Sequence, residues 1–243
     1  MLGGRFPLIK RSGGKYAMYK KVIDAFPDNY ESMTYVEPFV GGGSVFFNKE
    51  PSHKEIINDF DKDLFKLYQA VKKSPKELID RINGSYTQED FDELKQLNPT
   101  SDIGKVVKDY LLTFLSLYGT KRTFLHKNPV VDKDFQTYSD RLSSVSILNK
   151  DYKKVIHDYD SPNTFFYLDP PYEDTEKNIS QYSDINFDEL FHILSSIKGK
   201  FLLSVNNSKR IRDLFKEFHI KTTTTRYSLK PRKVTELFIS NYA

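Results

Sequence analysis

The sequence predicts an open α/β sheet flanked by helices, with a second, mostly helical unit inserted into it. Short apolar runs rich in β-branched and aromatic residues alternate with helical periodicity towards both ends of the chain, as in such a sheet. That alternation lapses between about residues 74 and 140. Polar residues follow several of the runs directly, and open α/β sheets bind ligands at those strand ends. We therefore assign residues 1–73 and 141–243 to the sheet domain and residues 74–140 to the inserted subdomain.

The composition allows an enzyme and limits its chemistry. A chain of 243 residues can bury a core and form one or two domains. Its 37 Lys and Arg against 33 acidic residues permit a nucleic-acid partner without requiring one. The absence of cysteine excludes disulfides and cysteine nucleophiles, and the five histidines lack metal-ligand spacing, so we expect no metal. Neither a signal peptide nor a membrane span is indicated, which predicts an intracellular protein.

The chain is organised around Asp169-Pro170-Pro171-Tyr172, which directly follows an apolar run at 164–168. The two prolines end the expected strand and stiffen the turn, because neither can donate a backbone hydrogen bond. Asp169 and the Pro170 carbonyl can accept both N–H bonds of an exocyclic amine, while Tyr172 stacks on the ring that carries it. The alternative is an ordinary strand-ending turn with an aromatic lid.

Two earlier stretches bear on the ligand. The basic turn Lys10–Lys15 precedes an expected helix from about Tyr16 to Phe26 and lacks the spacing of a Walker A loop. Residues 35–47 are predicted to form a short strand, a turn through Gly41–Gly43 and a helix. Glycines let a ligand approach the backbone closely, and helix amides can donate to a carboxylate or phosphate. Phe46 stands where the dinucleotide pattern requires a small residue, which disfavours a nicotinamide enzyme.

Asp59 follows a second predicted strand at 54–58. An acid at this position can accept both hydroxyls of a ribose, as in other nucleoside-binding α/β sheets. Alternatively, Asp59 or Asp61 could cap the helix expected over Leu64–Val71. The glycine-rich turn and Asp59 together favour a cofactor that contains a nucleoside.

The inserted subdomain contains a basic loop with interleaved aromatic residues at 118–127. Such a loop fits a phosphate backbone and an opened base pair, although a solvated surface hairpin would have the same composition. Helices are expected before it at 76–82, 88–97 and 106–117.

Alternation resumes in the last hundred residues. A polar loop at 173–183 follows the Asp169 motif and could close over a substrate. Arg226, Lys230, Arg232 and Lys233 place four cations within eight residues, which suits a phosphate contact or a solvated hairpin tip. Strands are expected at 144–148, 200–206, 222–229 and 236–242, and helices at 187–197 and 209–218.

Taken together, these stretches resemble one family, the Dam-type (D12 class) DNA adenine-N6 methyltransferases. They follow the family's order over nearly the whole chain. The matching segments are Lys10–Lys15, similar to K-W-A-G-G-K; Val36–Asn48, similar to V-E-P-F-x-G-x-G-S-V-x-x-N; Asp59–Tyr68, similar to D-x-x-x-D-L-x-x-x-Y; Asp169–Tyr172; and Arg232–Leu237, similar to R-K-x-x-E-L.

The resemblance implies a Rossmann-like methyltransferase sheet with a small target-recognition subdomain. It also implies S-adenosylmethionine as cofactor, double-stranded DNA as partner, and a flipped-out adenine as substrate. A monomer or weak dimer in the cytoplasm of a bacterium or phage-infected host is expected. The implied cofactor-binding residues are Arg11, Lys15, Phe39, Gly41, Gly43, Asp59 and Asp169; the catalytic residues are Asp169, Pro170 and Tyr172; and the DNA-binding residues are Tyr118, Lys121, Arg122, Arg232 and Lys233.

The chain departs from the family pattern at two places. Arg11 stands where the family usually has Trp, and the pattern N-R-x-x-x-N-G-x-x-R is only faintly echoed at Leu117–Arg122, so the sequence does not predict GATC as the target. Two other functions remain open. One is methyl transfer to another planar amine, on cytosine, an RNA base or a glutamine amide. The other is nucleic-acid binding without catalysis.

Overall fold

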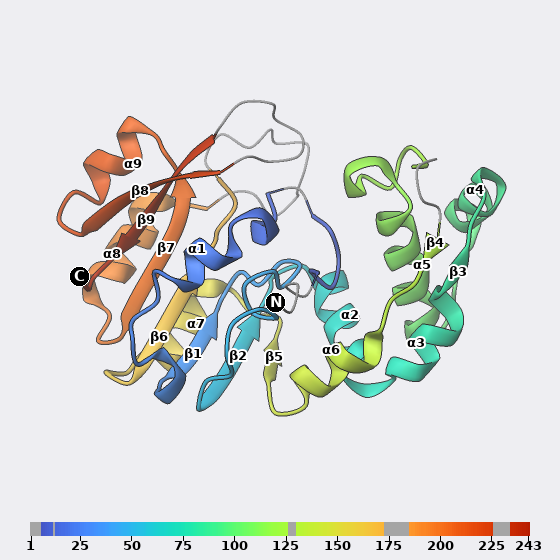
Figure 1. Cartoon of the computed structure of the whole chain (residues 1–243), viewed down its shortest axis with the longest axis horizontal. Helices are drawn as coiled ribbons and strands as arrows, with labels where there is room; N and C mark the ends of the chain where they lie inside the picture. Colours follow the sequence, from blue (N-terminus) through green and yellow to red (C-terminus); the bar gives the residue numbers. More distant parts are fainter. Residues whose placement is uncertain (1–5, 12, 126–129, 173–184, 226–233) are drawn as a thin grey trace.

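A seven-stranded sheet carries the fold in the computed structural model, which describes residues 6–11, 13–125, 130–172, 185–225 and 234–243. The first five strands of its order pair in parallel, and β9 runs antiparallel to both of its neighbours. The predicted Rossmann-like α/β sheet is thus confirmed (Figure 1). The strand order is β5 (Ser146–Leu148), β2 (Lys54–Asn58), β1 (Thr34–Glu37), β6 (Thr164–Leu168), β7 (Lys200–Asn206), β9 (Val234–Ser240) and β8 (His219–Thr225).

Helices cover both faces of this sheet. On one face α1 (Tyr19–Ile23) and α2 (Lys62–Lys73) share a core with the rings of β1 and β6. On the other face α7 (Tyr152–Tyr159), α8 (Phe187–Ser196) and α9 (Lys209–Leu214) pack on the remaining side chains of those strands. All five residues of β6 are buried, as expected for a continuous apolar run in a strand covered on both sides.

The strand order reverses between β1 and β6. From β1 the chain proceeds outward to β2 and β5, then returns to the other side of β1 to form β6 and β7. Because these strands are parallel, β1, β2 and β6 all end at the same edge of the sheet. A crevice forms outside the carboxyl ends at such a reversal. The sheet therefore brings the residues after Glu37, Asn58 and Leu168 together.

The segment between β2 and β5 leaves the sheet after α2 and builds a group of helices at the other end of the molecule (Figure 1). Side-chain caps start three of its helices, including a full capping box at Thr87, and the apolar faces meet around Leu78, Phe91, Tyr110 and Phe135. Its elements are α3 (Pro75–Ile82), β3 (Gly84–Ser85), α4 (Gln88–Gln96), α5 (Asp102–Phe114), η3 (Leu117–Gly119), β4 (Val130–Val131) and α6 (Phe135–Leu142).

Two expected helices differ from the structure. The prediction of a helix after the glycine turn is wrong, because residues 41–49 form consecutive turns instead. Asn48 donates its side-chain amide to the Ser44 carbonyl at 2.8 Å and so competes with the backbone ladder that a helix needs. The helix expected over Tyr16–Phe26 is split into η1 (Lys15–Ala17) and α1, with η2 (Tyr30–Ser32) following.

Helix α7 was not predicted, although Asp151 caps it by accepting from the Lys153 amide. The predicted loop at 173–183 and the predicted basic tip at 226–233 lie outside the described residues. Within the described residues, no helix is long and apolar enough to cross a membrane.

Candidate active site

A cavity of about 960 Å³ opens at the carboxyl edge of the sheet, between the sheet and the inserted subdomain. Asp169 and Asp59 both line it, so the acidic corner after β6 faces the same space as the acid after β2. Of the sequence-predicted residues, the cavity wall also includes Arg11, Lys15, Phe39, Gly41, Lys121, Arg122, Pro170 and Tyr172.

Lys15 joins the Asp169 corner to the N-terminal segment. Its ammonium lies 2.6 Å from Oδ1 of Asp169 and donates to the Tyr172 hydroxyl at 2.8 Å. Lys15 is only 3% exposed, while Asp169 keeps 19% of its side chain accessible. The ammonium also lies 4.9 Å from the centre of the Tyr172 ring, a cation–π distance. The corner is therefore held in place from one side by a buried cation.

The carboxyl of Asp169 has a pKa above that of an ordinary aspartate. Burial raises the pKa of its carboxyl to about 6, and the adjacent Lys15 ammonium limits that rise. A carboxylate with such a pKa is still ionised at neutral pH, yet it can take up a proton readily. This is the behaviour expected of a group that accepts hydrogen bonds from an amine and meets the proton the amine later gives up.

The glycine turn after β1 is packed so closely that side chains at Gly42 and Gly43 would clash with neighbouring atoms. Gly43 has φ +74°, and a Cβ there would lie 2.7 Å from the Tyr68 hydroxyl. A Cβ at Gly42 would collide with the Ile9 carbonyl oxygen. The backbone of the turn is thus packed between the N-terminal segment and α2. Gly43 itself does not line the cavity, so its contribution is to shape the turn.

Asp59 holds two backbone segments at the cavity edge. Its two oxygens accept from the Gly41 amide at 2.9 Å and from the Asp61 amide at 3.0 Å. Asp61, and not Asp59, caps α2 by accepting from Asp63 and Leu64, which answers the alternative left open by the sequence. Arg11 donates to Asp61 at 2.8 Å. Three of the predicted cofactor residues, Arg11, Gly41 and Asp59, are therefore linked through Asp61 in one hydrogen-bonded rim.

The inserted subdomain supplies the opposite wall. Lys121 and Arg122 line the cavity, and Lys121 forms an ion pair with Asp109 on α5. Lys121 has φ +62°, an uncommon conformation for a residue with a side chain, and its amide donates to the Ser116 hydroxyl at 2.8 Å. The predicted DNA contacts Arg232 and Lys233 and the side chain of Tyr118 lie outside the described residues.

Comparison with known proteins gives the family of this chain. A sequence profile of the family described as "D12 class N6 adenine-specific DNA methyltransferase" matches residues 12–229. The chain belongs to this family. It is an enzyme that methylates adenine N6 in DNA, and the resemblance found in the sequence is confirmed.

Relatives of similar length are named as type II methyltransferases or as a DNA adenine methylase. The type II methyltransferase M1.LlaDCHI of Lactococcus lactis subsp. cremoris is 28% identical over 97% of this chain and 95% of its own. The type II methyltransferase M.CviBI of Paramecium bursaria Chlorella virus NC1A is 23% identical over 97% of this chain and 99% of its own. A DNA adenine methylase of Haemophilus influenzae is 24% identical over 95% of this chain and 92% of its own.

The structure of this D12 methyltransferase also reveals cavity residues that the sequence did not single out. Tyr152 and Tyr167 line the cavity while almost wholly buried, and neither hydroxyl has a hydrogen-bond partner among the described residues. Asp151, the cap of α7, and Glu37, the last residue of β1, lie on the same wall. Strand alternation could have found Tyr167, which lies two residues before Asp169 and so shares its face of the sheet.

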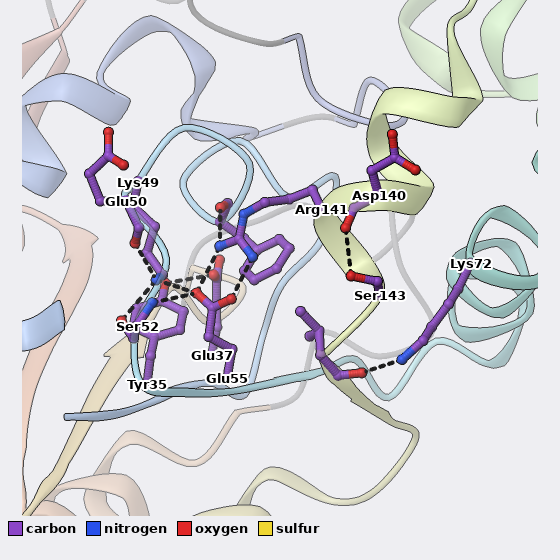
Figure 2. Close-up of polar contacts among 12 residues, drawn as sticks. Tyr35, Glu37, Lys49, Glu50, Ser52, Glu55, Lys72, Asp140, Arg141 and Ser143 are labelled. Carbon is purple, nitrogen blue, oxygen red and sulfur yellow. Dashed lines mark hydrogen bonds and ion pairs between the residues drawn. The ribbon is translucent and has the colours of Figure 1, made fainter. Parts of the chain in front are cut away.

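A buried polar cluster of the methyltransferase is centred on Glu55 (Figure 2). Glu55 on β2 accepts from Lys49 and from both terminal nitrogens of Arg141, which reaches it from α6. Arg141 also stacks on the Phe46 ring, 4.2 Å from its centre. The cluster therefore joins three separated segments: the chain after the turn, the second strand, and the helix that leads back from the insert.

Glu37 lies beside this cluster and reaches the cavity. It accepts from the Tyr35 hydroxyl at 2.7 Å (Figure 2). Burial raises the pKa of Glu37 to about 8, even though the Tyr35 hydrogen bond opposes the rise. At neutral pH the carboxyl is consequently protonated, so the cavity wall near Asp169 carries one carboxylate and one neutral carboxyl rather than two adjacent anions.

Proposed function

We propose that this methyltransferase moves the methyl group of S-adenosylmethionine directly to N6 of an adenine flipped out of double-stranded DNA. The observation that carries the proposal is a single cavity that holds the Asp169 corner, the glycine turn and Asp59. A purine amine and a nucleoside cofactor have to meet in one space for direct transfer. These residues supply a polar contact for each.

The wall of the cavity fits an S-adenosylmethionine molecule. The carboxylate of Asp59 can accept from the ribose hydroxyls, and the turn at Phe39–Gly43 can hold the methionine end. The Tyr152 hydroxyl, buried without a partner among the described residues, offers a further polar contact on the same wall. When bound, the cofactor supplies a methyl group on a positively charged sulfur, which makes that methyl electrophilic.

The Asp169 corner prepares the amine. Adenine N6 is a poor nucleophile because its lone pair is delocalised into the ring. If Asp169 and the Pro170 carbonyl accept its two N–H bonds, the nitrogen becomes more pyramidal and its lone pair points at the methyl group. Positioning of this kind contributes roughly 7–11 kcal/mol in favourable cases. Tyr172 stacks on the purine ring and keeps it in the plane that these two acceptors require.

The inserted subdomain, residues 74–140, would read the target and hold the opened duplex. A paired adenine buries N6 in the stack, so it has to leave the helix, which costs a few kcal/mol. Lys121 and Arg122 line the cavity and are proposed to bind phosphates, and Arg232 and Lys233 are proposed as further phosphate contacts. The subdomain would thus offset the cost of extrusion with backbone contacts.

Mass analysis of nucleosides tests the proposal directly. DNA from a methylation-free host and an unmodified RNA pool are each incubated with the protein and S-adenosylmethionine, then digested to nucleosides. We expect N6-methyladenine in the DNA sample alone. Appearance of N4-methylcytosine or a methylated RNA base would support methyl transfer to another planar amine. An absence of methyl incorporation, together with DNA binding that S-adenosylmethionine does not affect, would instead support the non-catalytic alternative.

Transfer should depend on pH through Asp169. Because burial raises the pKa of this carboxyl to about 6, we expect kcat/KM to fall as the pH drops through about 6. The protonated carboxyl is a weaker acceptor and presents an O–H donor to the amine, so it aligns the amine less well. Initial rates between about pH 5 and pH 8, with folding followed by circular dichroism at each pH, measure this. A rate that stays constant through about pH 5 in folded protein would contradict the assignment.

A further inference from the structure

A second carboxylate lies behind the Asp169–Lys15 pair. Glu236 on β9 is completely buried, with 0% exposure, and its Oε2 lies 3.8 Å from the Lys15 ammonium. The same oxygen accepts from the Ser204 hydroxyl at 3.3 Å. Burying a carboxylate away from water is costly unless a cation and hydrogen bonds compensate for it. Glu236 therefore belongs to the same electrostatic unit as Lys15.

The sheet explains how a residue far along the chain reaches this place. Leu168 pairs with Leu203, so Asp169 comes to lie beside Ser204 at the carboxyl end of β7. Strand β9 runs antiparallel to β7, and Glu236 pairs with Asn206 near that same end. Because paired and alternate residues share a face, the side chains of Asp169, Ser204 and Glu236 emerge on one side of the sheet. Lys15 covers that side from the N-terminal segment.

We propose that Glu236 is a positioning residue that keeps the Lys15 ammonium at Oδ1 of Asp169. The ammonium is shared between two carboxylates, one at the reacting corner and one fixed in the sheet. When Asp169 engages the amino group of the substrate, Glu236 remains as the counter-charge that prevents Lys15 from moving away. This inference rests on the role proposed above for Asp169.

The charged and titratable groups around Asp169 make the effect measurable. Lys15 approaches from η1, Glu37 from β1 and Glu236 from β9, while Tyr167 and Tyr172 come from its own segment. The Lys15 ammonium lowers the pKa of Asp169 and the Glu236 carboxylate raises it. Removing the Lys15 charge should therefore raise the pKa of Asp169, and removing the Glu236 charge should lower it.

The first variant is Glu236→Gln, which preserves size and can still bond to Ser204 but carries no charge. We expect kcat to fall by about tenfold to 100-fold, since a misplacement of about 1 Å at a reacting group costs about 100-fold. KM for cofactor and DNA should change little. The acid limb of kcat/KM reports the free enzyme, in which Asp169 itself still holds Lys15. Removing the Glu236 charge should therefore lower the pKa of Asp169 and move that limb to lower pH.

Three comparisons separate this role from a structural one. Glu236→Asp keeps the charge, so its acid limb should stay at the wild-type position and part of kcat should return. Lys15→Gln should lower kcat and move the acid limb to higher pH. Glu55→Gln, which removes a different buried carboxylate of the same sheet, should lower the melting temperature and leave the acid limb in place.

The proposed role of Glu236 can be tested even if one variant does not fold. A folded Glu236→Gln protein with wild-type kcat and an unmoved acid limb overturns the proposal. If Glu236→Gln does not fold, Lys15→Gln takes its place, and an unchanged kcat and acid limb there overturn it equally. A wild-type protein that methylates no adenine would refute the proposed function instead. Failure of the Glu236 role alone would leave wild-type activity and its loss in Asp169→Ala intact.

Discussion

Asp169→Ala should lower the rate of methyl transfer by about 1,000-fold or more, while the protein still binds S-adenosylmethionine. The substitution removes the proposed acceptor of the amine and the partner that holds Lys15 at 2.6 Å. The cofactor contacts proposed at Asp59 and the glycine turn are untouched, so affinity should fall only in part. Single-turnover transfer of a labelled methyl group, with calorimetric titration of the cofactor, measures both quantities.

Asp59→Ala provides the matched contrast. It removes a carboxylate from the same cavity, but one that holds the Gly41 and Asp61 amides instead of the reacting corner. Here the cofactor KM should rise while kcat at saturating cofactor remains closer to wild type. If Asp169→Ala turned over at a rate comparable to wild type, or if the two variants had interchanged phenotypes, the assigned roles would be wrong.

The strand that carries Asp169 could be predicted from the sequence because its signals are local. The run at 164–168 and β6 have the same bounds, and two prolines allow few alternatives to a strand end. Asp59 and the Gly41 turn were found for the same reason, since each follows directly on a strand that the pattern of apolar residues predicts. What local patterns supply is the strand and its end, and parallel pairing then brings those ends together.

Roles that depend on long-range pairing were not predicted. Glu236 lies in the Arg232–Leu237 segment that resembles the family, but no role was assigned to it from the sequence, and only the antiparallel register of β9 places it beside Lys15. The helix expected after the glycine turn failed for a related reason. The turn is shaped by long-range contacts with Ile9 and Tyr68, which local propensity does not contain. Pairing register and buried polar contacts both depend on segments far apart in the chain.

Glu55→Ala should cost about 3–5 kcal/mol of folding stability, because it breaks a buried ion pair by removing one partner. Glu55 is 4% exposed and binds both Lys49 and Arg141 (Figure 2). Its removal leaves two buried cations without their shared carboxylate, which is far more costly than losing an exposed ion pair. Urea unfolding at neutral pH measures the change.

Glu50→Ala is the control for this prediction. Glu50 carries an exposed carboxylate, and its contact with Lys49 comes from the backbone carbonyl, which alanine retains. Glu50→Ala should therefore change the free energy of unfolding by no more than about 0.5 kcal/mol. If Glu55→Ala were as mild as Glu50→Ala, the buried cluster would contribute little to folding.

The pH dependence of the Glu55→Ala effect follows from the same contacts. Burial alone would raise the pKa of Glu55, but hydrogen bonds from Arg141 and the Lys49 charge hold it below the ordinary value of 4.5. A carboxyl whose folded pKa is depressed contributes its stability above the unfolded pKa and loses it as the pH falls through the folded pKa. The gap between wild type and Glu55→Ala should therefore be full at neutral pH and narrow below about pH 4.5. Because Glu55 pairs with both Lys49 and Arg141, this gap measures the combined contribution of the two ion pairs, including the one that joins α6 to β2.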